Sequence, residues 1–244
     1  MPRPQKHFDA ILNRFQTESV IGINDLVRNF RELEPMVSRE AVNWRIFSLV
    51  SSGRLERIGR GSFRIGSVRN WAPVISKRDR LVFRKLSREF PFAGFCMWST
   101  AVFNEMLTHQ SGYPILMVET ARDTTEAVFH YLQRQNRSVF LNPSKELFER
   151  YISGIHDVIV IRPLISEAPV QEVDGVITVT IEKILVDLFC EDVCLEPFGG
   201  SQMLEIFTGA FERFTVNRTR LLRYASRRNR REVMEDWLQR GLGL

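Results

Sequence analysis

The stretch that most constrains the fold is residues 38–66, SREAVNWRIFSLVSSGRLERIGRGSFRIG, which joins a helical pattern to a tight, basic hairpin. Ser38 is a favoured helix N-cap, and the apolar residues after it recur at helical spacing. Gly53 ends this pattern. In the turn that follows, Gly59 and Gly61 flank Arg60, and glycine permits the positive φ that a short hairpin needs. We therefore predict a helix that runs into a β-wing.

The polar residues of this stretch have the chemistry that duplex DNA requires. Arg39 and Asn43 lie outside the apolar stripe and can reach base edges in the major groove, while Trp44 and Arg45 would brace the DNA backbone. Arginines of the wing would contact phosphate or the minor groove. The predicted DNA contacts are Ser38, Arg39, Asn43, Trp44, Arg45, Arg57, Arg60 and Arg64. A helix and hairpin with merely solvated arginines is the alternative.

Two amphipathic segments precede this stretch. Phe8, Ile11, Leu12 and Phe15 share one helical face within residues 7–16. Apolar residues at 23, 26, 27 and 30 do the same in the next segment. Three short helices and a wing within residues 1–66 predict a winged helix-turn-helix domain.

Composition indicates a globular protein of about two domains with charge that changes sign along the chain. The 244 residues have a formal net charge of +5. Residues 1–80 hold 15 Lys and Arg against 8 Asp and Glu, residues 81–213 hold 11 against 18, and the last 31 residues hold 8 against 3. Nucleic acid is therefore expected to meet the two ends of the chain. The three cysteines and four histidines show no pairing typical of a zinc site, so we expect no metal and reduced thiols.

Residues 67–80 mix Gly, Pro and charge without periodicity and are predicted to be a linker. From residue 81 onward, segments with strand and helix patterns alternate. Strands are expected over 92–99, 113–120, 137–142, 156–164 and 175–180, with helices over 99–110, 123–135 and 144–153. This pattern predicts an α+β protein whose second domain, residues 81–244, is a mixed α/β domain with a helical C-terminal portion.

The helical portion begins near residue 180 and becomes rich in arginine over residues 217–231. We expect a second phosphate-contacting surface there, formed by Arg220, Arg223, Arg227 and Arg228. The alternative is a solvated helix whose arginines pair with acidic neighbours.

No catalytic constellation or phosphate-cradling glycine loop is recognisable, so the chain is expected to be neither an enzyme nor a cofactor-binding protein. Gly199-Gly200-Ser201 lacks the downstream acidic pair that would hold magnesium, and Glu182-Lys183 lacks the spacing of a metal-dependent nuclease. Glu119, at the end of a predicted strand, could act as an acid but has no partner in the sequence. Its expected role is to cap the next turn through the amides near Thr120 and Arg122.

Several sequence segments of the second domain resemble those of a known family. They are WSTAVFNEMLTHQ, ILMVETARDTTEAVFHYL, IVIRPLISEAPVQEVDGVITVTIEKILVDLF and NRTRLLRYASRR. Together with the winged helix, they resemble the AbiEi family of antitoxins from type IV toxin–antitoxin (abortive infection) systems. The most specific pieces are residues 181–187 and 223–228, and the resemblance covers nearly the whole chain.

This resemblance implies a cytoplasmic autorepressor and antitoxin. Its winged helix would bind double-stranded operator DNA with an inverted repeat, as two copies of the chain, and its C-terminal domain would counteract a toxin that resembles a nucleotidyltransferase. The family's DNA-reading helix and wing would correspond to residues 38–52 and 54–65. Two rivals remain: a winged-helix regulator whose second domain senses a small molecule, and a nucleic-acid enzyme with a degenerate motif.

Overall fold

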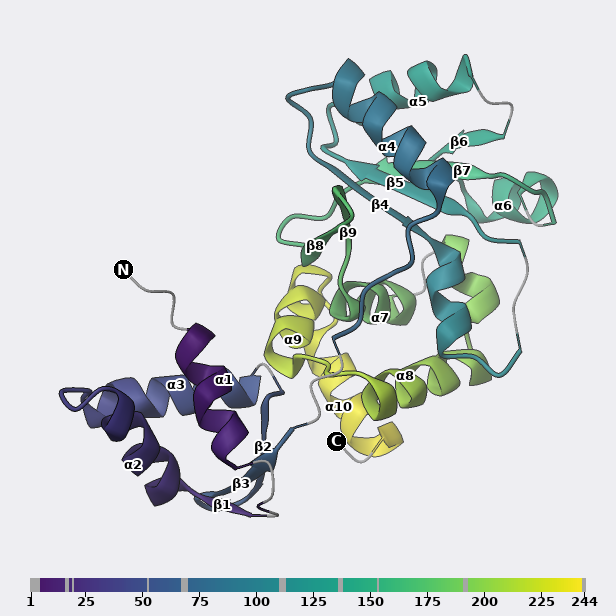
Figure 1. The fold of residues 1–244 in the computed structure, drawn as a ribbon. Coiled ribbons are helices and arrows are strands. Elements are labelled where there is room, and N and C mark those ends of the chain that lie inside the picture. Colours follow the sequence, from purple (N-terminus) through teal and green to yellow (C-terminus); the bar gives the residue numbers. More distant parts are fainter. Residues whose placement is uncertain are drawn as a thin grey trace. The chain divides into compact units, whose positions relative to one another are not determined.

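The computed structural model describes residues 5–15, 18, 20–51, 53–66, 70–109, 113–135, 138–152, 154–190 and 193–242. The chain divides into two compact units, Met1–Asn70 with Phe214–Thr219, and Trp71–Arg213 with Arg220–Leu244 (Figure 1). Each unit is described by itself.

The first unit contains three helices and a small antiparallel sheet. Its elements are α1 (Gln5–Arg14), β1 (Ile21–Gly22), α2 (Ile23–Leu33), α3 (Arg39–Ser51), β2 (Leu55–Gly59) and β3 (Ser62–Ile65). The sheet order is β1-β3-β2, so the wing hairpin β2–β3 pairs with the short strand that precedes α2. This is the arrangement of a winged helix, as the sequence predicts.

The core of the first unit consists of the apolar stripes expected from the sequence. Val42, Ile46 and Leu49 of α3 are buried against residues of α1, α2 and the wing. Two glycines have the backbone conformation that this geometry needs: Gly53 ends α3 with φ of 68°, and Gly61 forms the wing turn with φ of 74°. Side chains other than hydrogen adopt such φ values at a cost of about 1–2 kcal/mol.

The second unit is built on a mixed four-stranded sheet. Its sheet strands are β4 (Phe95–Ser99), β5 (Leu116–Thr120), β6 (Val139–Leu141) and β7 (Ile159–Pro163), in the order β4-β5-β7-β6. Strands β5, β6 and β7 run parallel, and β4 is antiparallel to β5. A separate hairpin consists of β8 (Val170–Val173) and β9 (Val176–Val179).

Helices cover the sheet and form the rest of the second unit. They are α4 (Lys77–Glu89), α5 (Thr125–Gln133), α6 (Lys145–Tyr151), α7 (Ile181–Phe189), α8 (Ser201–Arg213), α9 (Arg218–Arg227) and α10 (Arg231–Leu242), with 3-10 helices η1 (Thr100–Glu105) and η2 (Val193–Phe198). Helices α4 and α5 pack on one face of the sheet, and α7 contacts the other (Figure 1). The α+β architecture confirms the predicted fold class.

Two local predictions need correction, and one strand was not predicted. Helix α4 begins at Lys77, inside the predicted linker, and Trp71 is buried with its Nε1 donating to Glu105 at 2.8 Å, so the second unit begins earlier than residue 81. Residues 67–69 of that linker lie outside the described residues. The helix predicted over 99–110 is only the short 3-10 helix η1, because Met106 ends it. The strand that was not predicted is β8, whose four residues VQEV are exposed or half-buried and form no continuous apolar run.

None of the helices in the described part of the chain combines the length and the hydropathy that a membrane span requires.

Candidate functional site

Helix α3 presents a polar and aromatic face outside the core of the first unit. The amide of Ala41 donates to Ser38 Oγ at 3.2 Å, so Ser38 caps the helix as predicted. Arg39 and Asn43 are exposed one helical turn apart, and Trp44 beside them has an exposed fraction of 63%. These side chains are available for contact with another molecule.

Arg45 lies differently from the other predicted contacts on α3. Its Nη2 is 2.7 Å from Glu34 Oε2, and its guanidinium carbon is 5.6 Å from the centroid of the Phe30 ring. Arg45 is therefore held against its own unit.

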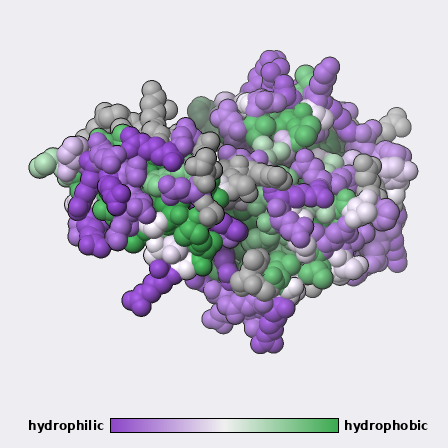
Figure 2. Space-filling view, turned by 60° about the horizontal axis from the view of Figure 1, so that its bottom comes forward, coloured by the Kyte–Doolittle hydropathy of each residue, from purple (hydrophilic) through white to green (hydrophobic). Residues whose placement is uncertain are grey.

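The three wing arginines differ in their surroundings. The Arg57 guanidinium lies 5.4 Å from the centroid of the Phe63 ring, and Arg64 Nη2 is 2.6 Å from Glu56 Oε2. Arg60 is exposed in the turn between β2 and β3 and makes no ion pair with a residue that the structure describes. On the face drawn in Figure 2, hydrophilic side chains cover much of the first unit, with smaller hydrophobic areas between them.

One exposed aromatic residue of α3 was absent from the predicted contacts. Phe47 has an exposed fraction of 62% and follows Asn43 by one helical turn. Phe47 has no polar atom in its side chain and therefore received no predicted DNA contact. It follows the exposed Trp44 by three residues, which places the two aromatic side chains next to each other on α3, and neighbouring exposed apolar side chains indicate a contact surface.

The arginine-rich segment of α9 is engaged within the second unit. Arg223 and Arg227 both pair with Glu167, and Arg228 Nη1 is 3.1 Å from Asp187 Oδ1. Arg220 Nη1 lies 3.6 Å from Glu182 Oε2. For Arg220, Arg223 and Arg227, these ion pairs favour the alternative of arginines with acidic neighbours over a second phosphate-contacting surface.

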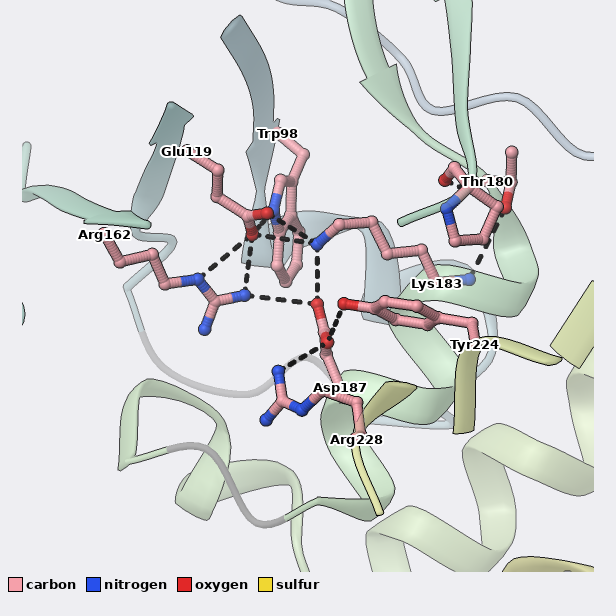
Figure 3. Close-up of polar contacts among 9 residues, drawn as sticks. Trp98, Glu119, Arg162, Thr180, Lys183, Asp187, Tyr224 and Arg228 are labelled. Carbon is pink, nitrogen blue, oxygen red and sulfur yellow. Dashed lines mark hydrogen bonds and ion pairs between the residues drawn. The ribbon is translucent and has the colours of Figure 1, made fainter. Parts of the chain in front are cut away.

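A cluster of buried charges lies between the sheet and α7, and we call it the charge cluster (Figure 3). Glu119 of β5 stands opposite Arg162 of β7 in the parallel register, and both face away from the apolar layer under α4 and α5. Lys183 and Asp187 lie four residues apart on α7, which places them on one side of the helix. All four residues are buried, and Lys183 is completely inaccessible.

The hydrogen bonds of the charge cluster converge on its two carboxylates. Glu119 Oε1 accepts from Trp98 Nε1 at 2.9 Å, from Arg162 Nη2 at 2.7 Å and from Lys183 Nζ at 2.9 Å. The same Lys183 ammonium donates to Asp187 Oδ2 at 2.6 Å. Lys183 therefore joins α7 to the sheet through Glu119, and within its own helix it also binds Asp187 (Figure 3).

Asp187 also connects α7 to α9. Its Oδ1 accepts from the Tyr224 hydroxyl at 2.9 Å and from Arg228 Nη1 at 3.1 Å, and its Oδ2 lies 3.2 Å from Arg162 Nη2. Both oxygens of Asp187 are thus hydrogen-bonded, which is the condition for burying a carboxylate without a large penalty.

The neighbouring charges keep Glu119 and Lys183 ionised in spite of their burial. Burial by itself would raise the pKa of Glu119, but Arg162 and Lys183 lower it to about 2. Burial would lower the pKa of Lys183, yet Asp187 and Glu119 raise it above its ordinary value. The pKa of Tyr224 is raised by burial and by Asp187, so its hydroxyl stays protonated and donates.

The predicted role of Glu119 as a cap of the next turn is wrong. Its carboxylate accepts from three side chains and is 1% exposed. The sequence contained a signal for these partners: Arg162 interrupts an apolar strand, and Lys183 and Asp187 interrupt an apolar helix with a spacing of four. Charges inside apolar segments are almost never buried unless they are paired.

A pocket of about 270 Å³ adjoins the charge cluster. Its lining residues are Glu119, Arg122, Asn142, Arg162, Pro163, Ile165, Asp187, Tyr224 and Arg228. Within the described residues, no group of three or more His, Cys, Asp or Glu side chains is arranged to hold a metal ion. The cluster carboxylates here have cationic side chains as their partners.

A protein-family model described as "Family of unknown function (DUF6577)" matches residues 41–243, a span from α3 to α10 that includes parts of both units. No curated protein matches the chain.

Replacing Lys183 with Met is expected to destabilise the second unit by about 3–5 kcal/mol, because Glu119 and Asp187 would lose a buried counter-charge. Urea unfolding followed by circular dichroism measures the change. Lys145→Met is the matched control, because Lys145 pairs with Glu196 at the surface, where ion pairs contribute little. Equal unfolding midpoints for the two variants would show that the cluster contributes nothing to stability.

Stability is also expected to depend on acid through Glu119. Its folded-state pKa of about 2 lies below its ordinary value of 4.5, so the ionised group stabilises the fold at neutral pH. This contribution is lost as the pH falls from about 5 toward 2. Urea unfolding across this range should give a shallower pH dependence for Glu119→Gln than for the wild type. Identical slopes would contradict the lowered pKa.

Proposed function

We propose that this chain, which belongs to the DUF6577 family, is a DNA-binding repressor that contacts its operator through α3 and the wing. The observation that carries the proposal is the exposed face of α3, where Arg39 and Asn43 lie one turn apart beside the capped N-terminus. Arginine and asparagine are the side chains that form bidentate hydrogen bonds with guanine and adenine in the major groove.

The wing and the local charge support the same role. Arg60 extends from the hairpin turn, where it can reach a phosphate or the minor groove. Residues 1–80 carry nearly twice as many basic as acidic residues, which favours association with a polyanion. A single module buries roughly 600–1,000 Å² on DNA, so we expect two copies of the chain on an inverted repeat.

Phe47 extends this face beyond the residues expected from the sequence. It lies one turn from Asn43 and is exposed, so a helix that places Asn43 at a base edge brings Phe47 close to the next bases. Apolar side chains contact the methyl group of thymine in the major groove. We therefore include Phe47 in the proposed DNA-contacting face.

For the second unit we propose the antitoxin activity that the AbiEi resemblance implies. The family match runs from α3 to α10 and thus joins parts of both units in one family. The expected partner is a nucleotidyltransferase-like toxin, and the catalytic activity of the pair would belong to that toxin. Both proteins would act in the cytoplasm, where the operator DNA is. Glu119 and Asp187 are paired with cationic side chains, which supports a non-enzymatic role for the second unit. A magnesium-dependent activity that Glu119→Ala abolishes would contradict this role.

The DNA-binding proposal is tested with a duplex from upstream of the chain's own gene and a scrambled duplex of equal length. Arg39→Ala and Asn43→Ala should each weaken operator binding by about 10- to 100-fold and scrambled binding much less. Arg60→Ala should weaken binding of the two duplexes equally, and it should reduce the magnitude of the slope of log affinity against log salt concentration by about 1. The control is Arg88→Ala on α4. Unchanged operator affinity in all three test variants would exclude this face.

The antitoxin proposal is tested by co-expression of the toxin with full-length chain from an unrelated promoter. A variant that combines Arg39→Ala, Asn43→Ala and Arg60→Ala should lose operator binding and still restore growth, because protection is assigned to the second unit. Circular dichroism establishes that the variant is folded. Growth arrest with a folded variant would assign protection to the DNA-binding face instead.

A further inference from the structure

The pocket beside the charge cluster lies where parallel strands end. Arg122 follows β5, Asn142 follows β6, and Ile165 follows β7, so three successive turns line one pocket at the carboxyl edge of the sheet. The remaining wall comes from the region of α9, through Tyr224 and Arg228. In open α/β sheets, ligands bind in the crevice outside the carboxyl ends of the strands.

The connections between these strands favour a crevice at this edge. Strand β5 leads through α5 to β6, and β6 leads back through α6 to β7, which lies between the other two. The chain thus reverses its direction across the sheet, and such a reversal separates the turns at the strand ends. The turn after β6 begins with Asn142 at φ of 39°, a conformation that asparagine tolerates better than most residues.

The charge around the pocket is positive. Arg122, Arg162 and Arg228 line it, and Lys183 lies directly behind Glu119. These four cations face two carboxylates, Glu119 and Asp187, and the hydroxyl of Tyr224 is protonated. The site is therefore complementary to a ligand with two negative charges.

The structure also indicates which cations would meet the ligand. Arg162 and Lys183 are buried and donate to the carboxylates. Arg122 is exposed and makes no ion pair with any residue in the described ranges, and Arg228 is partly exposed, with Nη1 on Asp187. The planar guanidinium group matches the geometry of phosphate oxygens and can bind two of them at once.

We propose that this pocket binds the terminal phosphate of a phosphate monoester, with Arg122 and Arg228 as its charged contacts. A phosphate monoester carries a charge of about −1.5 to −2 at pH 7, which matches the excess of cations. A divalent metal ion fits less well, because the carboxylates that would bind it already accept from Lys183 and Arg162. The proposal concerns the second unit and does not depend on DNA binding.

Isothermal titration calorimetry of the full chain tests the proposal with AMP, inorganic phosphate and adenosine as probes. AMP and phosphate should bind, whereas adenosine, which lacks the phosphate, should not. Arg122→Gln should weaken AMP binding about 10-fold, the effect of losing one charge-assisted contact. Arg88→Gln is the matched control, because α4 packs on the opposite face of the sheet. Its affinity should equal that of the wild type.

A second variant and a second pair of probes sharpen the test. Arg228→Gln should also weaken AMP binding, and circular dichroism separates this effect from unfolding, since Arg228 contacts Asp187. Two sources of such a monoester are a free metabolite and the 5′ end of a nucleic-acid strand. To distinguish these sources, binding of AMP is compared with binding of two trinucleotides, one with a 5′-phosphate and one with a 5′-hydroxyl end. Absence of binding by every phosphate probe at millimolar concentration, or binding unchanged in Arg122→Gln, would overturn the proposal.

Discussion

The second unit depends on a buried ammonium group that is shared by two carboxylates. Lys183 Nζ lies 2.7 Å from Glu119 Oε2 and 2.6 Å from Asp187 Oδ2. Each of these three side chains has an exposed fraction of at most 1%. Removing these charges from water is costly, and their mutual attraction offsets the cost only when the geometry is good and the remaining oxygens are hydrogen-bonded. Trp98, Arg162 and Tyr224 supply those bonds.

This network determines how the elements of the second unit meet. It ties β4, β5 and β7 to α7 on the face of the sheet opposite α4 and α5, and through Asp187 it reaches α9. Because the network needs every partner in place, α7 has one acceptable position against the sheet, whereas apolar side chains would tolerate several. The pocket at the carboxyl edge is a consequence, since its polar wall consists of the same side chains.

The two units use arginine in different ways. In the first unit Arg39 and Arg60 are exposed on the helix and the wing, where they can meet a polyanion. In the second unit Arg223 and Arg227 share Glu167, and Arg162 is buried in the charge cluster. The density of arginine along the chain is therefore a poor guide to nucleic-acid contact, because an acidic partner distant in sequence can neutralise it.

The sequence by itself determined the winged-helix unit, the alternation of strands and helices and the positions of most of them, because these follow from local periodicity, caps and turn glycines. It also placed Arg39, Asn43 and Arg60 outside the core. Tertiary structure decided which charges meet. Glu119 and Arg162 are 43 residues apart, and only the parallel register of β5 and β7 brings them together. Side-chain pairing between parallel strands depends on which strands the crossover connections place side by side, and here β7 returns to lie between β5 and β6.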